Sequence, residues 1–110
     1  MYWKCTVCNL LWEGDKPPDK CPKCGSPGEK YQELTQEQWD LVERSRFTNS
    51  LHVHLLTILP DLQEMAREGL EDELDPRCVD IFQRLLDEAT FLEKSIKAEI
   101  NGHVNKGKWG

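Results

Sequence analysis

Four cysteines near the start of the chain are arranged in two Cys-x-x-Cys pairs. Cys5 and Cys8 form the first pair, twelve residues follow, and Cys21 and Cys24 form the second. A Cys-x-x-Cys turn, called a knuckle below, brings two thiolates to one side of a tight loop, so two knuckles can present four sulfurs to one metal ion tetrahedrally. The pattern predicts a four-sulfur metal site, and by itself it does not distinguish iron from zinc.

The residue after each knuckle is of a type that tolerates the backbone conformation of a tight turn. Gly25 follows the second knuckle and Asn9 follows the first. Glycine adopts the left-handed backbone conformation without steric cost, and asparagine is among the next most tolerant residues. Because such a turn directs backbone N–H groups at the sulfurs, we expect both positions to be left-handed.

The cysteine content also bears on the cellular compartment. The first residues, Met1-Tyr2-Trp3-Lys4-Cys5, lack the apolar stretch of a signal peptide, and the longest run without a charge, residues 47–60, is too short to cross a bilayer. Cysteines in a chain without an export signal predict metal binding in a reducing compartment rather than disulfides. We therefore expect a cytoplasmic protein with no membrane partner.

The chain divides near Leu34 into regions of different composition. Residues 1–34 hold four of the five cysteines and much of the proline and glycine, so we expect a loop-rich metal-binding domain. A segment this small needs a bound metal or another cross-link to stay folded. Residues 35–101 carry helix signals, namely a Thr35-x-x-Gln38 capping box, an N-cap and proline at Asp75-Pro76, and a stop at Gly102. Because Pro60 kinks or breaks a helix, we expect helices over 35–59, or kinked to 74, and over 76–101, followed by a tail over 102–110.

The helical region has more apolar side chains than the contact between the two helices of one hairpin can bury. Val42, Val53 and Leu56 lie opposite the main stripe of the first helix, and Phe91 lies opposite that of the second. We therefore predict a mostly α fold in which two antiparallel hairpins form a four-helix bundle in a homodimer; a monomer whose second face is covered by the cysteine-rich domain or by residues 61–74 is the alternative. The stripes expected to be buried are Phe47, Leu51, Leu55, Ile58, Leu59, Leu62, Met65 and Ala66 in the first helix, and Cys78, Val79, Ile81, Phe82, Leu85, Leu86, Ala89, Leu92, Ile96 and Ile100 in the second.

Charge is concentrated in the helical region. Residues 35–101 carry seven basic and fifteen acidic side chains, whereas residues 1–34 carry five of each. An acidic surface repels phosphate backbones, so we expect no nucleic-acid partner and consider a basic protein surface a better one.

The cysteine-rich stretch has further features around the two pairs. They are the aromatic residue before the first cysteine, the Glu13-Gly14-Asp15-Lys16-Pro17-Pro18 loop, the spacing of the two pairs and the Cys21-Pro22-Lys23-Cys24-Gly25 knuckle. With these features, residues 2–34 resemble the rubredoxin-like domain of rubrerythrins, although Asn9 stands where the family usually has glycine. The resemblance implies one iron per chain held by Cys5, Cys8, Cys21 and Cys24, cycling between the ferrous and ferric states.

The resemblance favours a non-catalytic electron-transfer protein whose redox partners are a flavoprotein or another reductase and a neighbouring oxidoreductase. The alternative is a zinc-ribbon subunit in which the metal is structural and the helical bundle binds a partner.

A bundle with a second metal or a haem is the third hypothesis. A rubrerythrin di-iron site needs Glu-x-x-His pairs, and no histidine has a glutamate three residues before it, so a peroxidase of that type is not expected. The remaining candidate for a second site is the set His52, His54 and Glu93, which border or lie within the apolar stripes.

Overall fold

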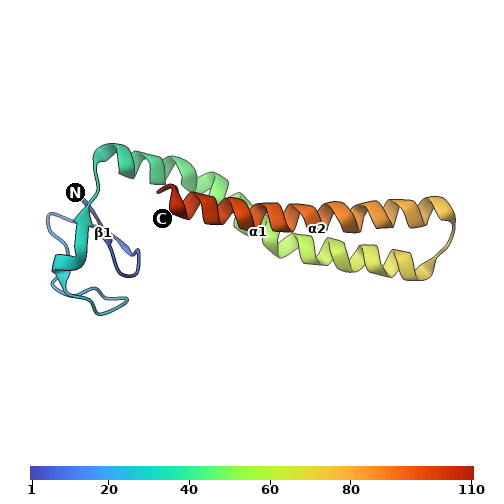
Figure 1. Cartoon of the computed structure of the whole chain (residues 1–110), viewed down its shortest axis with the longest axis horizontal. Helices are drawn as coiled ribbons and strands as arrows, with labels where there is room; N and C mark the ends of the chain where they lie inside the picture. Colours follow the sequence, from blue (N-terminus) through green and yellow to red (C-terminus); the bar gives the residue numbers. More distant parts are fainter. The chain divides into compact units, whose positions relative to one another are not determined.

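The structure, a computed structural model, describes residues 1–110 and divides into two compact units. The cysteine unit comprises residues 1–46 with 107–110, and the hairpin unit comprises residues 47–106. The fold is mostly α, as expected, and neither helix combines the length and apolarity that a membrane span requires. The elements are β1 (Tyr2–Cys5), β2 (Leu11–Glu13), a short 3₁₀ helix (Gly28–Lys30), β3 (Tyr31–Glu33), α1 (Gln36–Asp72) and α2 (Pro76–Asn105) (Figure 1).

The cysteine unit contains a three-stranded antiparallel sheet with the strand order β2-β1-β3. Cys5, Cys21 and Tyr31 form a buried cluster, with Trp3, Cys8 and Leu10 packed against them, and Trp39 and Val42 near the start of the first helix are also buried in this unit. A core this small cannot offset the conformational entropy of an ordered chain. The unit therefore depends on a further constraint at the cysteines.

Aromatic stacking joins the strands of the cysteine unit to the start of α1. The rings of Tyr2 and Trp39 stack with centroids 3.9 Å apart and planes 6° apart, and the Arg46 guanidinium lies 4.9 Å from the Trp39 ring centroid. Arg46 Nε also donates a hydrogen bond to the Gly110 carbonyl oxygen at 2.8 Å. The stack and this bond place the chain's last residues in the cysteine unit.

The N-terminal caps of both helices form as the sequence predicts. Thr35 Oγ1 accepts a hydrogen bond from the Gln38 backbone N–H at 3.1 Å, and Gln38 Oε1 accepts one from the Thr35 N–H at 2.8 Å. At the second helix, Asp75 Oδ1 accepts from the Cys78 N–H at 2.8 Å. These bonds satisfy donors that the first turn of a helix leaves free.

The ends of the helices differ from the simplest reading of the sequence. The first helix continues through Pro60 to Asp72, close to the longer of its two expected ranges. The second helix passes through Gly102, which was expected to stop it, and ends at Asn105. The glycine that has a left-handed backbone just beyond this helix is Gly107, at φ +71°. The extension buries His103 in the hairpin unit, and this packing outweighs the low helix propensity of glycine.

The two helices of the hairpin unit run antiparallel beside each other (Figure 1). Their core is formed by Leu59, Ala89 and Ile96, with Leu56, Leu62 and Ile100 packed around it. Near the turn, a Cβ atom on Gly69 would lie 2.3 Å from the Phe82 ring, so this close approach of the helices requires glycine.

The buried face of α1 matches the predicted stripe only in part, with Leu59 and Ala66 buried as expected. The buried positions include the polar residues Asn49 and Gln63, whereas the Phe47 side chain is 71% exposed and Ile81 of the second stripe is 65% exposed. Helix packing depends on which faces meet across the pair, and a pattern that is apolar on more than one side leaves that choice open. The other expected stripe residues that are exposed in the single chain are Leu51, Leu55, Ile58, Met65 and Leu92.

Candidate metal centre

The four predicted cysteine sulfurs converge at one point of the cysteine unit, and all lie within 4.8 Å of one another. The Sγ atoms of Cys5 and Cys24 are 3.7 Å apart, as are those of Cys8 and Cys21. A metal ion bound to four sulfurs at about 2.3 Å requires tetrahedron edges of about 3.8 Å. The donor set therefore fits a tetrahedral transition-metal ion.

The two knuckles repeat the same backbone hydrogen bonds. Cys5 N–H donates to the Leu10 carbonyl at 2.9 Å, and Cys21 N–H donates to the Ser26 carbonyl at 2.8 Å. In the next turn, the N–H of Asn9 bonds to the carbonyl of Cys5, and the N–H of Gly25 bonds to that of Cys21, both at 2.9 Å.

The residue after each knuckle has the expected left-handed backbone, with φ of 67° at Asn9 and 78° at Gly25. Asparagine therefore performs at the first knuckle the backbone role that glycine performs at the second. The two loops are local structures that hold two sulfurs each, and the sheet brings the pairs together.

Ionisation of the thiols shows why the site needs a cation. Burial acts to raise the pKa of the Cys21 thiol, but the Tyr31 hydroxyl and backbone N–H groups of the second knuckle favour the thiolate and lower the pKa to about 6. At Cys8 the Leu10 N–H lowers the pKa, yet burial and the other three cysteines outweigh it and raise the pKa to about 11. Ionisation is therefore favoured at Cys21 and opposed at Cys8 by the neighbouring sulfurs, so a bound cation is needed to hold four thiolates together.

Two polar side chains adjoin the sulfurs. Cys24 Sγ lies 3.2 Å from Ser26 Oγ, and the hydroxyl favours the thiolate and lowers the pKa of Cys24. The Tyr31 hydroxyl oxygen is buried without a hydrogen bond of regular geometry, and it interacts electrostatically with the Cys21 sulfur. Burial and this contact raise the pKa of Tyr31, which therefore stays protonated beside the sulfurs.

Burial differs between the two cysteines of each pair. Cys5 is 0% exposed and Cys21 is 2% exposed, whereas Cys8 is half-buried and Cys24 is exposed. The first cysteine of each knuckle thus anchors the core, and the second brings a sulfur toward the surface. The fifth cysteine, Cys78, is half-buried at the start of α2 and belongs to no group of metal ligands.

The residues predicted for a second site lie in the hairpin unit without forming a three-ligand cluster. Glu93 Oε2 is 3.4 Å from Gln63 Nε2, and Glu93 Oε1 is 3.7 Å from Lys97 Nζ. His54 is exposed, and His52 is half-buried with its Nδ1 atom buried and unpartnered.

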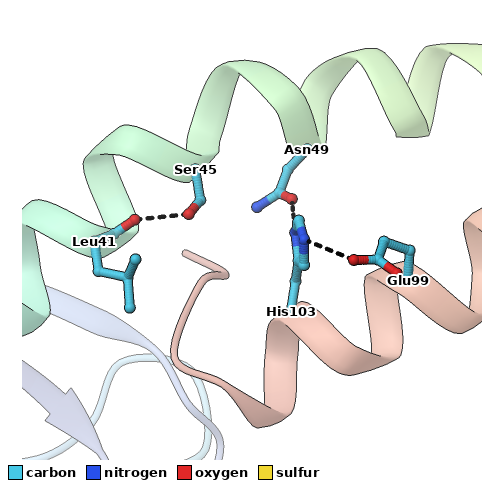
Figure 2. Close-up of polar contacts among 5 residues, drawn as sticks. All are labelled: Leu41, Ser45, Asn49, Glu99 and His103. Atoms are coloured by element: carbon cyan, nitrogen blue, oxygen red, sulfur yellow. Dashed lines mark hydrogen bonds and ion pairs between the residues drawn. The ribbon is translucent and has the colours of Figure 1, made fainter.

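The histidine with the most defined environment is one that the sequence reasoning assigned to the tail. His103 Nδ1 lies 2.5 Å from Asn49 Oδ1, and its Nε2 lies 3.4 Å from Glu99 Oε1 (Figure 2). The His52 ring is edge-on to the His103 ring at a centroid distance of 6.2 Å. The available signal was the Glu99-to-His103 spacing of one helical turn, which has a structural meaning only if the helix continues past Gly102.

Comparisons with known proteins agree with this geometry. Residues 3–32 match the family described as the rubredoxin-like domain of rubrerythrin. Reverse rubrerythrin-1 of Clostridium acetobutylicum is 24% identical over 79 residues, which cover 72% of this chain and 39% of that protein. The chain therefore spans well under half the length of this curated relative, and the match is long enough to include part of the helical region. No solved structure matches the chain. The N-terminal part of the protein thus carries a rubredoxin-type metal site followed by a helical hairpin.

Proposed function

We propose that the protein is an electron carrier in which Cys5, Cys8, Cys21 and Cys24 hold one iron ion. The observation that carries the proposal is the convergence of four sulfurs at tetrahedral spacing inside a domain of the rubredoxin type. Iron in such a cage supplies a one-electron ferric–ferrous couple.

The chain contributes by holding the four sulfur ligands rigidly and by placing them close to the surface. The paired backbone hydrogen bonds of the knuckles hold the sulfurs in place, so little rearrangement accompanies a change of charge. The backbone N–H groups and the Ser26 hydroxyl favour thiolates, and burial of Cys5 and Cys21 keeps water away from half of the donor set. A reductase such as a flavoprotein would donate the electron, and a neighbouring oxidoreductase would accept it.

The test is the metal content and the spectrum of protein purified without air from its native host. We expect one iron per chain and a charge-transfer band that bleaches on dithionite reduction and returns on oxidation. A Cys24→Ser variant should shift that band, because it replaces a ligand, and a Cys78→Ser variant should not, because Cys78 lies outside the cage.

One zinc per chain with no band would overturn the electron-carrier proposal. It would favour the alternative, in which the metal is structural and the hairpin unit is the working surface. Recombinant protein alone does not decide the matter, since such cages accept either metal during overexpression.

We also propose that a second copy of the chain covers the apolar side chains that the hairpin unit leaves exposed. Phe47 and Phe91 are 71% and 67% exposed, and large apolar patches on a soluble protein mark interaction sites. Two copies pairing through these faces would form a four-helix bundle, which buries both sides of each hairpin.

Analytical ultracentrifugation tests this pairing. We expect the wild-type chain to sediment as a dimer and the Phe47→Asp and Phe91→Asp variants to sediment as monomers. Asn101→Asp, which adds the same charge at an exposed polar position of α2, is the matched control and should stay dimeric. A monomeric wild-type chain at micromolar concentration would overturn the dimer.

A further inference from the structure

The surface next to the two exposed sulfurs has a charge opposite to that of the whole chain. The formal net charge of the protein is −6, and the hairpin unit contributes six basic and twelve acidic side chains. The two segments that carry the ligands, residues 4–10 and 20–26, contain three lysines and no acidic residue. The lysines are Lys4, Lys20 and Lys23.

The side chains around the sulfurs are accessible. Cys24 is exposed, Cys8 is half-buried, and Val7 between the two cysteines of the first knuckle is 58% exposed. Lys23 is exposed within the second knuckle, and Lys20 Cε lies 3.5 Å from the position of a Cβ on Gly25, so the Lys20 chain extends along that knuckle. None of the three lysines takes part in an ion pair.

The nearest acidic residues in sequence belong to other parts of the cysteine unit. Asp19 and Glu29 line a shallow hollow together with Lys16 and the neighbouring prolines. Glu13 pairs with Tyr2 at the start of β1, whereas Cys5 lies at the end of that strand. The sulfurs therefore reach the surface among lysines.

We propose that this surface, formed by Thr6, Val7, Cys8, Lys20, Lys23 and Cys24 and called the sulfur face, docks the acidic surface of a redox protein. The inference rests on the proposed function, since it identifies the partner surface at the same metal centre. At physiological ionic strength charges are largely screened beyond about 8 Å, so an encounter at the sulfur face is governed by the charges of that face itself. Exposed Val7 provides an apolar contact, and the lysines orient the partner.

The bound metal does not reverse the sign of this face. Four thiolates carry a net charge of −1 with an iron(III) ion and −2 with iron(II) or zinc. The two lysines of the sulfur face, Lys20 and Lys23, exceed the first charge and balance the second. The thiolate charge is also partly neutralised by the N–H groups of the knuckles, whereas the exposed ammonium groups meet an approaching partner first. A basic partner, which the overall charge would favour, is therefore disfavoured at this face.

A paramagnetic anion tests the face without relying on redox chemistry. Zinc-loaded full-length protein is titrated with hexacyanochromate(III), and broadening of the backbone amide NMR signals is followed. We expect the strongest broadening at residues 6–9 and 23–25. The double variant Lys20→Gln/Lys23→Gln should bind the probe about tenfold more weakly, because two charges at short range are lost.

The matched control is Lys16→Gln/Lys94→Gln, which removes the same charge from the cysteine unit's hollow and from α2. It should leave the broadening at the knuckles unchanged. Equal weakening in both double variants, or stronger broadening at the knuckles by the cation hexaamminechromium(III), would overturn the proposal.

Electron exchange with the iron-loaded protein gives a second readout. Reduced protein transfers one electron to hexacyanoferrate(III), and stopped-flow absorbance gives the rate. We expect the rate to fall with added salt and to fall about tenfold in Lys20→Gln/Lys23→Gln, with the opposite trends for the cationic oxidant hexaamminecobalt(III). A rate with hexacyanoferrate(III) that rises with salt would overturn the sulfur face, whereas protein that binds only zinc would overturn the electron-carrier proposal and leave the NMR result to decide the face.

Discussion

The cysteine unit and the hairpin unit both have small cores, and they differ in the interactions that order them. The cysteine unit buries few apolar side chains, namely Cys5, Cys21, Tyr31, Trp39 and Val42, and its order is concentrated in two loops that present sulfurs. The hairpin unit has long helices with capped starts, yet its core is a single line of contacts around Leu59, Ala89 and Ile96.

The difference identifies what each unit lacks. The cysteine unit needs a cation to hold four thiolates together, because ionisation of one thiol opposes that of its neighbours. The hairpin unit leaves large apolar side chains exposed, because a pair of helices buries one face of each. In the functions proposed above, a metal ion stabilises the first unit and a second copy of the chain covers the apolar side chains of the other.

The largest expected difference between the two units follows from replacing a buried metal-ligating cysteine. In Cys21→Ala we expect bound metal to fall below one per chain and the amide signals of residues 2–33 to lose their dispersion, while the helical circular dichroism persists. The metal-binding free energy of structural thiolate sites is on the order of 10 kcal/mol, which the small core of this unit cannot replace. Metal analysis and NMR give the readout. A Cys21→Ala protein that kept one metal ion and the dispersion would contradict this account, and Cys78→Ala is the control.

Shortening a core side chain of the hairpin unit should instead destabilise that unit. Leu59 is 3% exposed, so Leu59→Ala removes buried contacts and is expected to lower the free energy of unfolding of the hairpin unit by about 2–5 kcal/mol. Urea unfolding followed by far-ultraviolet circular dichroism measures the effect. Leu74→Ala, at a residue that is 74% exposed in the turn, should change stability far less. Equal effects of the two substitutions would show that Leu59 is not a core residue.

The polar pair between the helices is expected to have a smaller effect. Asn49→Ala removes the acceptor for the buried His103 Nδ1–H and should destabilise the hairpin unit by about 1–3 kcal/mol. The same urea experiment applies, with the exposed Asn101→Ala as control. An unchanged unfolding midpoint in Asn49→Ala would mean that the hydrogen bond contributes nothing to the pairing of the helices.

The smallest effect is a pH dependence at the start of α2. The Cys78 backbone N–H donates to the Asp75 carboxylate and lowers its pKa below the usual 3.8. Because the folded-state pKa is the lower one, the cap stabilises the helix above the unfolded-state pKa, and this contribution is lost as the pH falls through the folded-state pKa. Asp75→Asn keeps a neutral cap and should lose less protection there on acidification.

Amide hydrogen exchange at Cys78 and Val79, measured at neutral pH and near about pH 3, provides the measurement. Asp80→Asn removes a carboxylate from the helix surface away from the cap and is the matched control. Loss of protection in Asp75→Asn equal to that of the wild-type protein would exclude the carboxylate as the titrating cap.

Local features were predictable and packing features were not. The pairing of two sulfurs within each Cys-x-x-Cys loop, the left-handed Asn9 and the caps at Thr35 and Asp75 depend on hydrogen bonds within a few residues, and all of them are present in the structure. The buried stripe of α1 was wrong in part, because a helix that is apolar on more than one side does not state which side meets its neighbour.

The sequence by itself determined the chemistry of the metal centre, since a Cys-x-x-Cys loop holds two sulfurs through its own backbone and the motif states the donor set. Only the tertiary structure decided which cysteine of each pair is buried, whether α2 continues through Gly102, and that His103 faces Asn49. Those outcomes depend on the free energy of contacts between segments far apart in the chain. Spacing along the sequence reports local geometry, whereas burial is a property of the packed molecule.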